Sequence, residues 1–198
     1  MSKLFIMCAP SGAGKTTIAN KAVELDKNIA LSISHTTRPP RPGEVDGKDY
    51  YFVTEKNFQK LFKENQFIES ANVYGFSYGT TKSWVDKMLG ENLDILLEID
   101  CQGAQQIKNN IKNAVGIFIL PPSRDELKNR LISRRQDSQE VIERRLKSID
   151  SEIANIKQFD YVIINTDVEK AVKDFISIVK AERLTTSSQT DNINKALG

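Results

Sequence analysis

The first residues whose types and spacing could do chemistry lie near the N-terminus, in the segment 9–17. An apolar run from Leu4 to Cys8 precedes this segment and predicts a buried strand, and a pattern of helical period begins at Lys15. A strand, a short glycine-bearing loop and a helix start are the context of a phosphate-binding loop, in which backbone N–H groups and the helix dipole bind an anion. In such a loop we expect Lys15 to reach the terminal phosphates and the Thr16 hydroxyl to hold Mg²⁺.

One position of this loop departs from the strict consensus, because Ala9 stands where G-x-x-x-x-G-K-T has its first glycine. Alanine fits that position if its backbone φ is negative. The alternative is a chance Gly-x-Gly-Lys turn, and the strand before the loop and the helix after it favour the phosphate-binding interpretation.

A second apolar run ends in acidic residues, since Asp94 to Asp100 reads as a hydrophobic strand with a carboxylate at its end. An acid at the carboxyl end of a parallel strand, beside a phosphate-binding loop, can orient the water shell of a metal ion. This Walker B pattern is weak alone and gains weight from the N-terminal loop.

The arginines are clustered, whereas the lysines are scattered along the chain. Seven of the nine arginines are Arg38, Arg41 and five between Arg130 and Arg145. The guanidinium group is planar and binds phosphate oxygens in a bidentate manner, so both clusters are candidate anion sites. The first lies in a stiff, proline-rich segment, and the second in two predicted helices that would make a charged lid. Solvated helix faces and a plain linker are the alternatives.

The composition excludes several classes of protein. The chain has 198 residues and a net charge of +2, which is too close to neutral for a dedicated nucleic-acid binder. No apolar run approaches membrane length, and the N-terminus enters a strand without a signal peptide, so we expect a cytoplasmic protein without a membrane partner. Cys8 and Cys101 are far apart and predict buried thiols of a reducing compartment rather than a disulfide or a metal pair.

Between the two ends, the sequence predicts a small insertion, mostly β, over residues 49–78. Gly75 to Thr80 is expected to be a turn, and Phe67 to Tyr74 a strand that carries Glu69 among apolar residues. Strand alternation leaves open whether Glu69 faces solvent or a ligand. The polar segment 185–198 has little to bury and is expected to be disordered.

Several longer motifs are typical of one enzyme family. They are Ser34-His35-Thr36-Thr37-Arg38, Pro40-Arg41-Pro42-Gly43-Glu44, Gly47-Lys48-Asp49-Tyr50, Tyr78-Gly79-Thr80, Glu98-Ile99-Asp100-Cys101-Gln102-Gly103 and Leu120-Pro121-Pro122-Ser123. With them the chain resembles the guanylate kinases of bacterial type, which are P-loop nucleoside monophosphate kinases, from the first strand to about Arg183. The resemblance implies ATP-dependent phosphorylation of GMP, and of dGMP, to the diphosphate, with ATP and Mg²⁺ as cofactors. It leaves the oligomeric state open, a dimer included.

The resemblance also implies roles for individual residues. The implied catalytic residues are Lys15, Arg38, Arg134 and Arg145, with Arg130 nearby. The implied ATP-binding residues are Ala9, Pro10, Ser11, Gly12, Ala13, Gly14, Lys15, Thr16, Thr17 and, near the adenine, Asn165. The implied GMP-binding residues are Ser34, Arg38, Arg41, Tyr50, Glu69, Tyr78, Thr80, Glu98 and Asp100. Thr16 is the implied Mg²⁺ ligand, with Asp100 acting through the metal's water shell.

The expected fold is α/β, a parallel sheet flanked by helices with two insertions. The implied domain, residues 1–184, has a core (1–33, 91–125 and 158–184), a GMP-binding lobe (34–90) and a lid (126–157). Two other functions compete with GMP phosphorylation. A non-catalytic guanylate kinase-like module would bind proteins, although such modules typically degrade the phosphate loop, which is intact here. A related kinase with another acceptor is disfavoured by Ser34 and Glu69.

Overall fold

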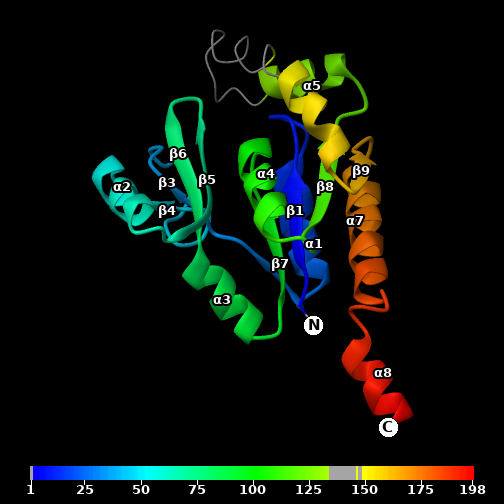
Figure 1. Ribbon diagram of the computed structural model, residues 1–198. Helices are drawn as coiled ribbons and strands as arrows, with labels where there is room; N and C mark the ends of the chain where they lie inside the picture. The colour runs from blue at the N-terminus through cyan, green and yellow to red at the C-terminus, as the bar shows by residue number, and fades with distance from the viewer. Residues whose placement is uncertain (1, 134–145, 147–148) are drawn as a thin grey trace.

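The computed structural model describes residues 2–133, 146 and 149–198, which form two β-sheets and the helices around them (Figure 1). The larger sheet has five strands, all parallel, in the order β2-β7-β1-β8-β9. Their bounds, in that order, are Ile29–Leu31, Asp94–Glu98, Leu4–Cys8, Val115–Leu120 and Tyr161–Ile164. The predicted α/β fold with a parallel sheet flanked by helices is therefore confirmed.

Helices cover both faces of this sheet. Its central strands carry apolar side chains on both faces, and both faces must therefore be shielded from water. All five residues of β1 are buried. Helices α1 (Lys15–Leu25) and α7 (Val168–Arg183) pack on one face, where Phe5 of β1 meets Phe175 of α7 edge to face. Helices α3 (Lys82–Gly90) and α4 (Cys101–Asn110) cover the other face.

The smaller sheet lies to one side of the larger one, in the order β4-β3-β6-β5 (Figure 1). Its strands are β4 (Tyr51–Phe52), β3 (His35–Thr36), β6 (Phe76–Thr81) and β5 (Phe67–Val73), and helix α2 (Glu55–Lys63) accompanies them. The expected turn at residues 75–80 is wrong, since these residues mostly belong to strand β6. The chain reverses instead at Tyr74 and Gly75, which both have positive φ, and β6 then pairs antiparallel with β5.

The described residues that flank the second arginine cluster are helical. Helix α5 (Arg124–Ser133) follows the two prolines that end β8, and residues 149–154 are helical before the short 3₁₀ helix η1 (Asn155–Gln158). Arg134 and Arg145, the predicted lid arginines, lie outside the described residues. None of the helices described in residues 2–133 and 149–198 is long and apolar enough to cross a membrane.

The C-terminal segment corrects one expectation, because it is not disordered. Helix α8 (Thr190–Leu197) extends away from the rest of the molecule, and none of its residues is buried (Figure 1). Serine and threonine side chains join it to α7, since the Ser188 hydroxyl donates to the carbonyl of Glu182 at 2.9 Å and contacts Thr185. Disorder was expected because this segment has few apolar residues to bury. Local hydrogen bonds of serine and threonine side chains order the turn between α7 and α8 instead.

Candidate active site

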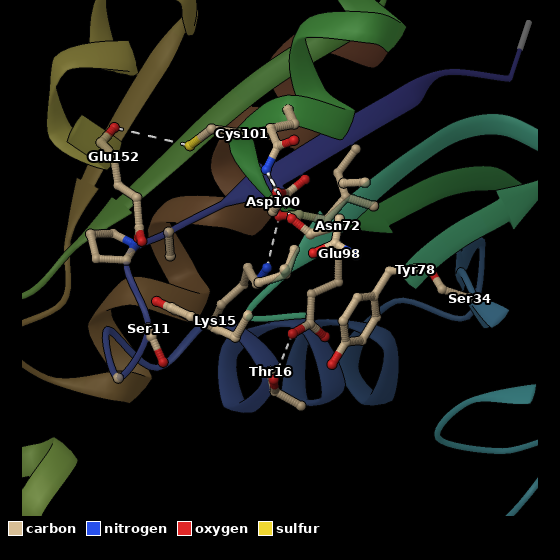
Figure 2. A pocket seen from close by; sticks show the side chains of 18 of the residues that line it. Ser11, Lys15, Thr16, Ser34, Asn72, Tyr78, Glu98, Asp100, Cys101 and Glu152 are labelled. Atoms are coloured by element: carbon tan, nitrogen blue, oxygen red, sulfur yellow. Dashed lines mark hydrogen bonds between the residues drawn. The ribbon is translucent and has the colours of Figure 1, made fainter. Parts of the chain in front are cut away.

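A cavity of about 470 Å³ lies between the carboxyl ends of the central strands and the smaller sheet. Its walls come from the loop after β1, the end of β7, strand β5 and the helical residues near Glu152 (Figure 2). In open parallel sheets, ligands bind outside the carboxyl ends of the strands, so this cavity has the expected position for a nucleotide site.

The start of helix α1, after the loop that follows β1, presents backbone donors to the cavity. Gly14 sits at the N-cap of α1 with φ +96°, a left-handed conformation that glycine adopts without a steric penalty. No side chain in the described chain caps this helix end, whereas Asp100 caps α4 and Asp167 caps α7. The first N–H groups of α1 therefore remain available for an anion, where the helix dipole also favours negative charge.

Lys15 and Thr16, the first two residues of α1, reach toward the end of strand β7. The Lys15 ammonium donates to the carbonyl oxygen of Ile99 at 2.7 Å, and the Thr16 hydroxyl donates to Glu98 Oε1 at 2.5 Å (Figure 2). A hydroxyl and a carboxylate are oxygen ligands of the hard type that Mg²⁺ prefers, and Mg²⁺ usually takes few protein ligands beside phosphates and water. Thr16 and Glu98 therefore fit a magnesium site.

Asp100 lies just after the end of β7, where the Walker B pattern predicts an acid, and its carboxylate also caps a helix. Its Oδ1 accepts the backbone N–H of Gly103 at 2.9 Å and caps helix α4, and its Oδ2 accepts from the side chain of Gln102 at 3.2 Å. The carboxylate that contacts Thr16 belongs to Glu98. Asp100 lines the same cavity and orients the start of α4, which packs against the acceptor side of the site.

Glu69, on strand β5, is a buried carboxylate that lines the cavity and is only 3 % exposed. Its Oε1 accepts the backbone N–H of Thr80 at 2.8 Å, and the Thr80 hydroxyl is 2.9 Å from the hydroxyl of Ser34. Burial raises the pKa of Glu69 to about 7, although the hydrogen bond from Thr80 opposes the shift. The alternative of a solvent-facing Glu69 is excluded, and the carboxylate has acceptor capacity for a ligand that brings N–H donors.

A group of basic and aromatic side chains forms the wall next to Glu69. Tyr50 and Tyr78 both line the cavity, with ring centroids 6.0 Å apart in an edge-to-face arrangement, and burial raises the pKa of Tyr50 so that it stays a neutral hydroxyl. Arg41 lines the cavity as well. Arg38 lies over the Tyr50 ring and pairs with Glu44, whose Oε1 accepts from its Nη2 at 2.8 Å. The arrangement is a rigid cationic and hydroxyl-rich corner suited to a phosphate.

Asn165 holds the phosphate-binding loop from behind. It is 1 % exposed, its Nδ2 donates to the carbonyl of Ala13 at 2.7 Å, and it does not line the cavity. A Cβ atom on Gly14 would stand 2.4 Å from the same Nδ2, so glycine is required there on steric grounds as well. The implied contact of Asn165 with the adenine stays a prediction, and the contact that the structure shows is the one that holds the loop from beneath.

We expect Asn165→Asp to destabilise the protein and to weaken ATP binding. The change places a carboxylate oxygen against the Ala13 carbonyl, and leaving that buried acceptor unpaired costs about 1–3 kcal/mol. Urea unfolding and the KM for ATP measure the two effects. Asn192→Asp, at an exposed position of α8, is the matched control and should change neither quantity. Wild-type stability in Asn165→Asp would contradict the role of this hydrogen bond.

The comparison with known proteins agrees with this geometry. The family model described as guanylate kinase matches residues 1–182. The chain belongs to the guanylate kinase family. It is 50% identical to a guanylate kinase of Nitrosomonas europaea, over 96% of this chain and 94% of the relative, and 47% identical to one of Coxiella burnetii, over 99% and 95%.

A solved guanylate kinase confirms the fold at the level of structure. The crystal structure of guanylate kinase from Anaplasma phagocytophilum is similar to this chain with a TM-score of 0.79 and 35% sequence identity, and the match covers 93% of this chain and 88% of that one. The resemblance to the guanylate kinases inferred from sequence motifs is thus confirmed, and these comparisons give no support to a non-catalytic module.

Most residues implied by the guanylate kinase motifs meet at one cavity, and the others fall into two groups. Those that line it are Ala9, Pro10, Ser11, Gly12, Gly14, Lys15, Thr16, Ser34, Arg41, Tyr50, Glu69, Tyr78, Glu98 and Asp100. Those described elsewhere are Ala13, Thr17, Arg38, Thr80 and Asn165, of which Arg38 and Thr80 contact lining residues. Arg134 and Arg145 remain predictions because they are not among the described residues.

The cavity also contains residues that the sequence analysis did not single out. Ala71 and Val73 share the cavity with Glu69, and the alternation of strand β5 could have indicated them, since residues two apart face the same side. Ser151, Glu152 and Asn155 reach the cavity from the other end of the chain. No local pattern marks these three, because only the tertiary fold brings them to the site.

Proposed function

We propose that this protein transfers the γ-phosphoryl group of ATP to GMP, and by the same base contacts to dGMP, with GDP or dGDP and ADP as products. The observation that carries this proposal is the shared cavity. An uncapped helix start with Lys15 and Thr16 lies on one side, and the buried acid Glu69 lies on the other. Membership in the guanylate kinase family supports the same assignment.

On the donor side, the loop N–H groups and Lys15 would bind the ATP phosphates. Thr16 and Glu98 would hold Mg²⁺, which when bound neutralises charge on the phosphates. Lys15 already points to the edge of the cavity, since its ammonium lies on the Ile99 carbonyl. Positive charge that is fixed before the reaction stabilises the transition state without reorganisation.

On the acceptor side, Glu69 would read the guanine base. Guanine presents two adjacent donors, N1–H and the exocyclic amine, and one carboxylate accepts both, whereas adenine presents an acceptor at N1. Each carboxylate oxygen has two lone pairs, so the bond from Thr80 leaves room for the ligand. Ser34, Thr80 and Asp100 would assist by holding this carboxylate and the start of α4.

The GMP phosphate would lie in the corner made by Arg41, Tyr50 and Tyr78, with Arg38 behind Tyr50. The phosphate itself is then the nucleophile, and the protein supplies position and charge rather than a reactive side chain. We also propose that Arg134 and Arg145, within the lid (126–157), act on the transferred phosphoryl group. We propose in addition that the chain is divided into a core, a GMP-binding lobe and this lid. A cytoplasmic location follows from the substrates proposed.

An assay of ADP production with four acceptors tests the function. GMP, AMP, CMP and UMP are each supplied with ATP and Mg²⁺, and ADP is detected by a coupled reaction. We expect kcat/KM for GMP to exceed that for AMP by roughly 10-fold or more, because one bidentate base contact is worth about 1–3 kcal/mol. Equal rates with all four acceptors would exclude base reading at this cavity.

We expect GMP affinity to fall as the pH is lowered from 8 to 6. The ionised form of Glu69 binds the guanine donors, and its pKa is raised to about 7, so at pH 6 only about a tenth of the protein carries the binding form. Calorimetric Kd values should weaken about tenfold. The GMP phosphate also titrates near pH 6, so Glu69→Gln serves as the reference. Parallel pH curves for the wild type and the variant would contradict the assignment.

A further inference from the structure

The two cysteines of the chain meet at the edge of the active-site cavity. The sulfur atoms of Cys8 and Cys101 lie 2.8 Å apart, and both residues are free thiols. Cys8 is the last residue of β1 and fully buried, whereas Cys101 is the first residue of α4, half-buried and part of the cavity lining (Figure 2). Both are free thiols, as the sequence predicts, but Cys101 is only half-buried, and the sequence did not indicate that the two sulfurs are in contact.

The fold itself brings these residues together. Strands β1 and β7 are parallel neighbours with Met7 opposite Glu98, and the Ile99 N–H donates to the Met7 carbonyl at 3.3 Å. The residues that follow both strands therefore leave the sheet at the same edge. A disulfide has an S–S bond of about 2.05 Å, so the sulfurs need to approach by only roughly 0.8 Å.

The two thiols have unequal surroundings, which is the arrangement of a reactive cysteine and its partner. Cys101 is half-buried and lines the cavity at the N-terminal end of the ten-residue helix α4. Cys8 is enclosed, and its hydrogen bond with Cys101 together with burial raises its pKa. Oxidants in solution can reach Cys101, and Cys8 stands at contact distance to complete a disulfide.

We propose that Cys8 and Cys101 form a reversible disulfide on exposure to a hydroperoxide, and that this bond suppresses phosphoryl transfer. The second half of this inference rests on the proposed function. In the first step, the Cys101 sulfur attacks the hydroperoxide, the O–O bond breaks, an alcohol or water leaves, and Cys101 becomes a sulfenic acid. In the second step, the Cys8 sulfur attacks Cys101, the S–O bond breaks, and water leaves with the Cys8 proton.

The disulfide would act on both halves of the site. Cys8 directly precedes Ala9, where the phosphate-binding loop begins, and Cys101 directly follows Asp100. Helix α4 is joined to the acceptor side, because the side chain of Gln106 donates to the Ser70 carbonyl at 2.7 Å and accepts its N–H at 3.1 Å. A bond between the sulfurs ties the loop to this helix, and a 1 Å displacement of catalytic groups costs about 10² in rate.

The test treats the reduced, full-length protein with hydrogen peroxide and measures three quantities. We expect intact mass to fall by two hydrogen atoms, peptide mapping to join Cys8 to Cys101, and kcat with ATP and GMP to fall at least about tenfold. Dithiothreitol should restore both thiols and the rate. Cys101→Ser and Cys8→Ala, each compared with its own untreated sample, should form no intramolecular disulfide and keep their rates after the same treatment.

Other results overturn the inference. Two thiols that persist after peroxide, oxidation of Cys101 alone, disulfides between molecules, or a joined pair with an unchanged rate would each contradict it. Mass and peptide mapping do not depend on activity. A joined pair in a protein that is inactive toward GMP before treatment would therefore count against the proposed function and leave the disulfide site standing.

Discussion

Replacing Lys15 by methionine should lower kcat by about 10³-fold or more while the fold stays intact. The Lys15 ammonium lies at the start of α1 and donates to the Ile99 carbonyl, so it is held at the cavity before any ligand binds. Its positive charge stabilises the transition state more than the bound substrates, because negative charge moves between the phosphates during the reaction. Steady-state kinetics at saturating ATP and GMP give kcat, and circular dichroism with urea unfolding checks the fold.

Lys21→Met is the matched control for this experiment. Lys21 lies on the same helix, but its side chain is exposed and pairs with Glu169 on α7, away from the cavity. An exposed ion pair contributes little to stability, so this variant should retain the wild-type kcat. A folded Lys15→Met protein that turns over GMP at the wild-type rate would remove the phosphate-binding interpretation of the loop.

Glu69→Gln should impair GMP use far more than ATP use. The amide oxygen can still accept from Thr80, but the amide NH₂ then faces a guanine N–H in place of a carboxylate oxygen. Losing a charge-assisted pair and adding a donor clash costs about 2–4 kcal/mol, which corresponds to roughly 30- to 1000-fold in kcat/KM for GMP. The KM for ATP should stay close to the wild-type value, and the preference for GMP over AMP should narrow.

Glu64→Gln provides the control, because Glu64 is an exposed carboxylate at the end of α2 and does not line the cavity. It should leave the preference for GMP unchanged. If Glu69→Gln retains the wild-type GMP/AMP ratio, recognition of the base must be assigned to other residues, first to Ser34 and Asp100, which also line the cavity.

The donor loop could be predicted from the sequence because its determinants are local. A buried strand, glycines with positive φ and a helix start are consecutive in the chain, and each leaves its own pattern. The parallel sheet was predictable for a related reason, since β1, β7 and β8 are apolar almost throughout and such strands need helices on both faces. Longer motifs then indicated the family and most of the lining residues.

Pairing between distant residues could not be predicted in the same way. The Walker B pattern pointed to Asp100, but it could not show that Glu98 contacts Thr16 on helix α1 or that Asp100 caps α4. Alternation alone left the direction of Glu69 open, and only the pairing of β5 with β6 and the packing of α4 decide it. Such contacts depend on which strands are neighbours, and no local pattern encodes that.

The contacts of the two cysteines and of Asn165 could not be predicted from the sequence either. Cys8 and Cys101 are far apart in sequence and meet because parallel strands end at a common edge. Asn165 follows the edge strand β9 and reaches under the loop to Ala13, a contact that no local pattern indicated. A motif identifies a residue as part of a site, but the surrounding packing determines which atoms it contacts.

The most direct test of the account follows the phosphoryl group itself. ATP with a radioactive γ-phosphoryl group is incubated with the protein, Mg²⁺ and GMP, and the labelled products are separated. We predict that the label appears in GDP, that little appears in inorganic phosphate, and that AMP in place of GMP gives far less labelled diphosphate. Label that stays in ATP, or that passes to inorganic phosphate whether or not GMP is present, would contradict the account.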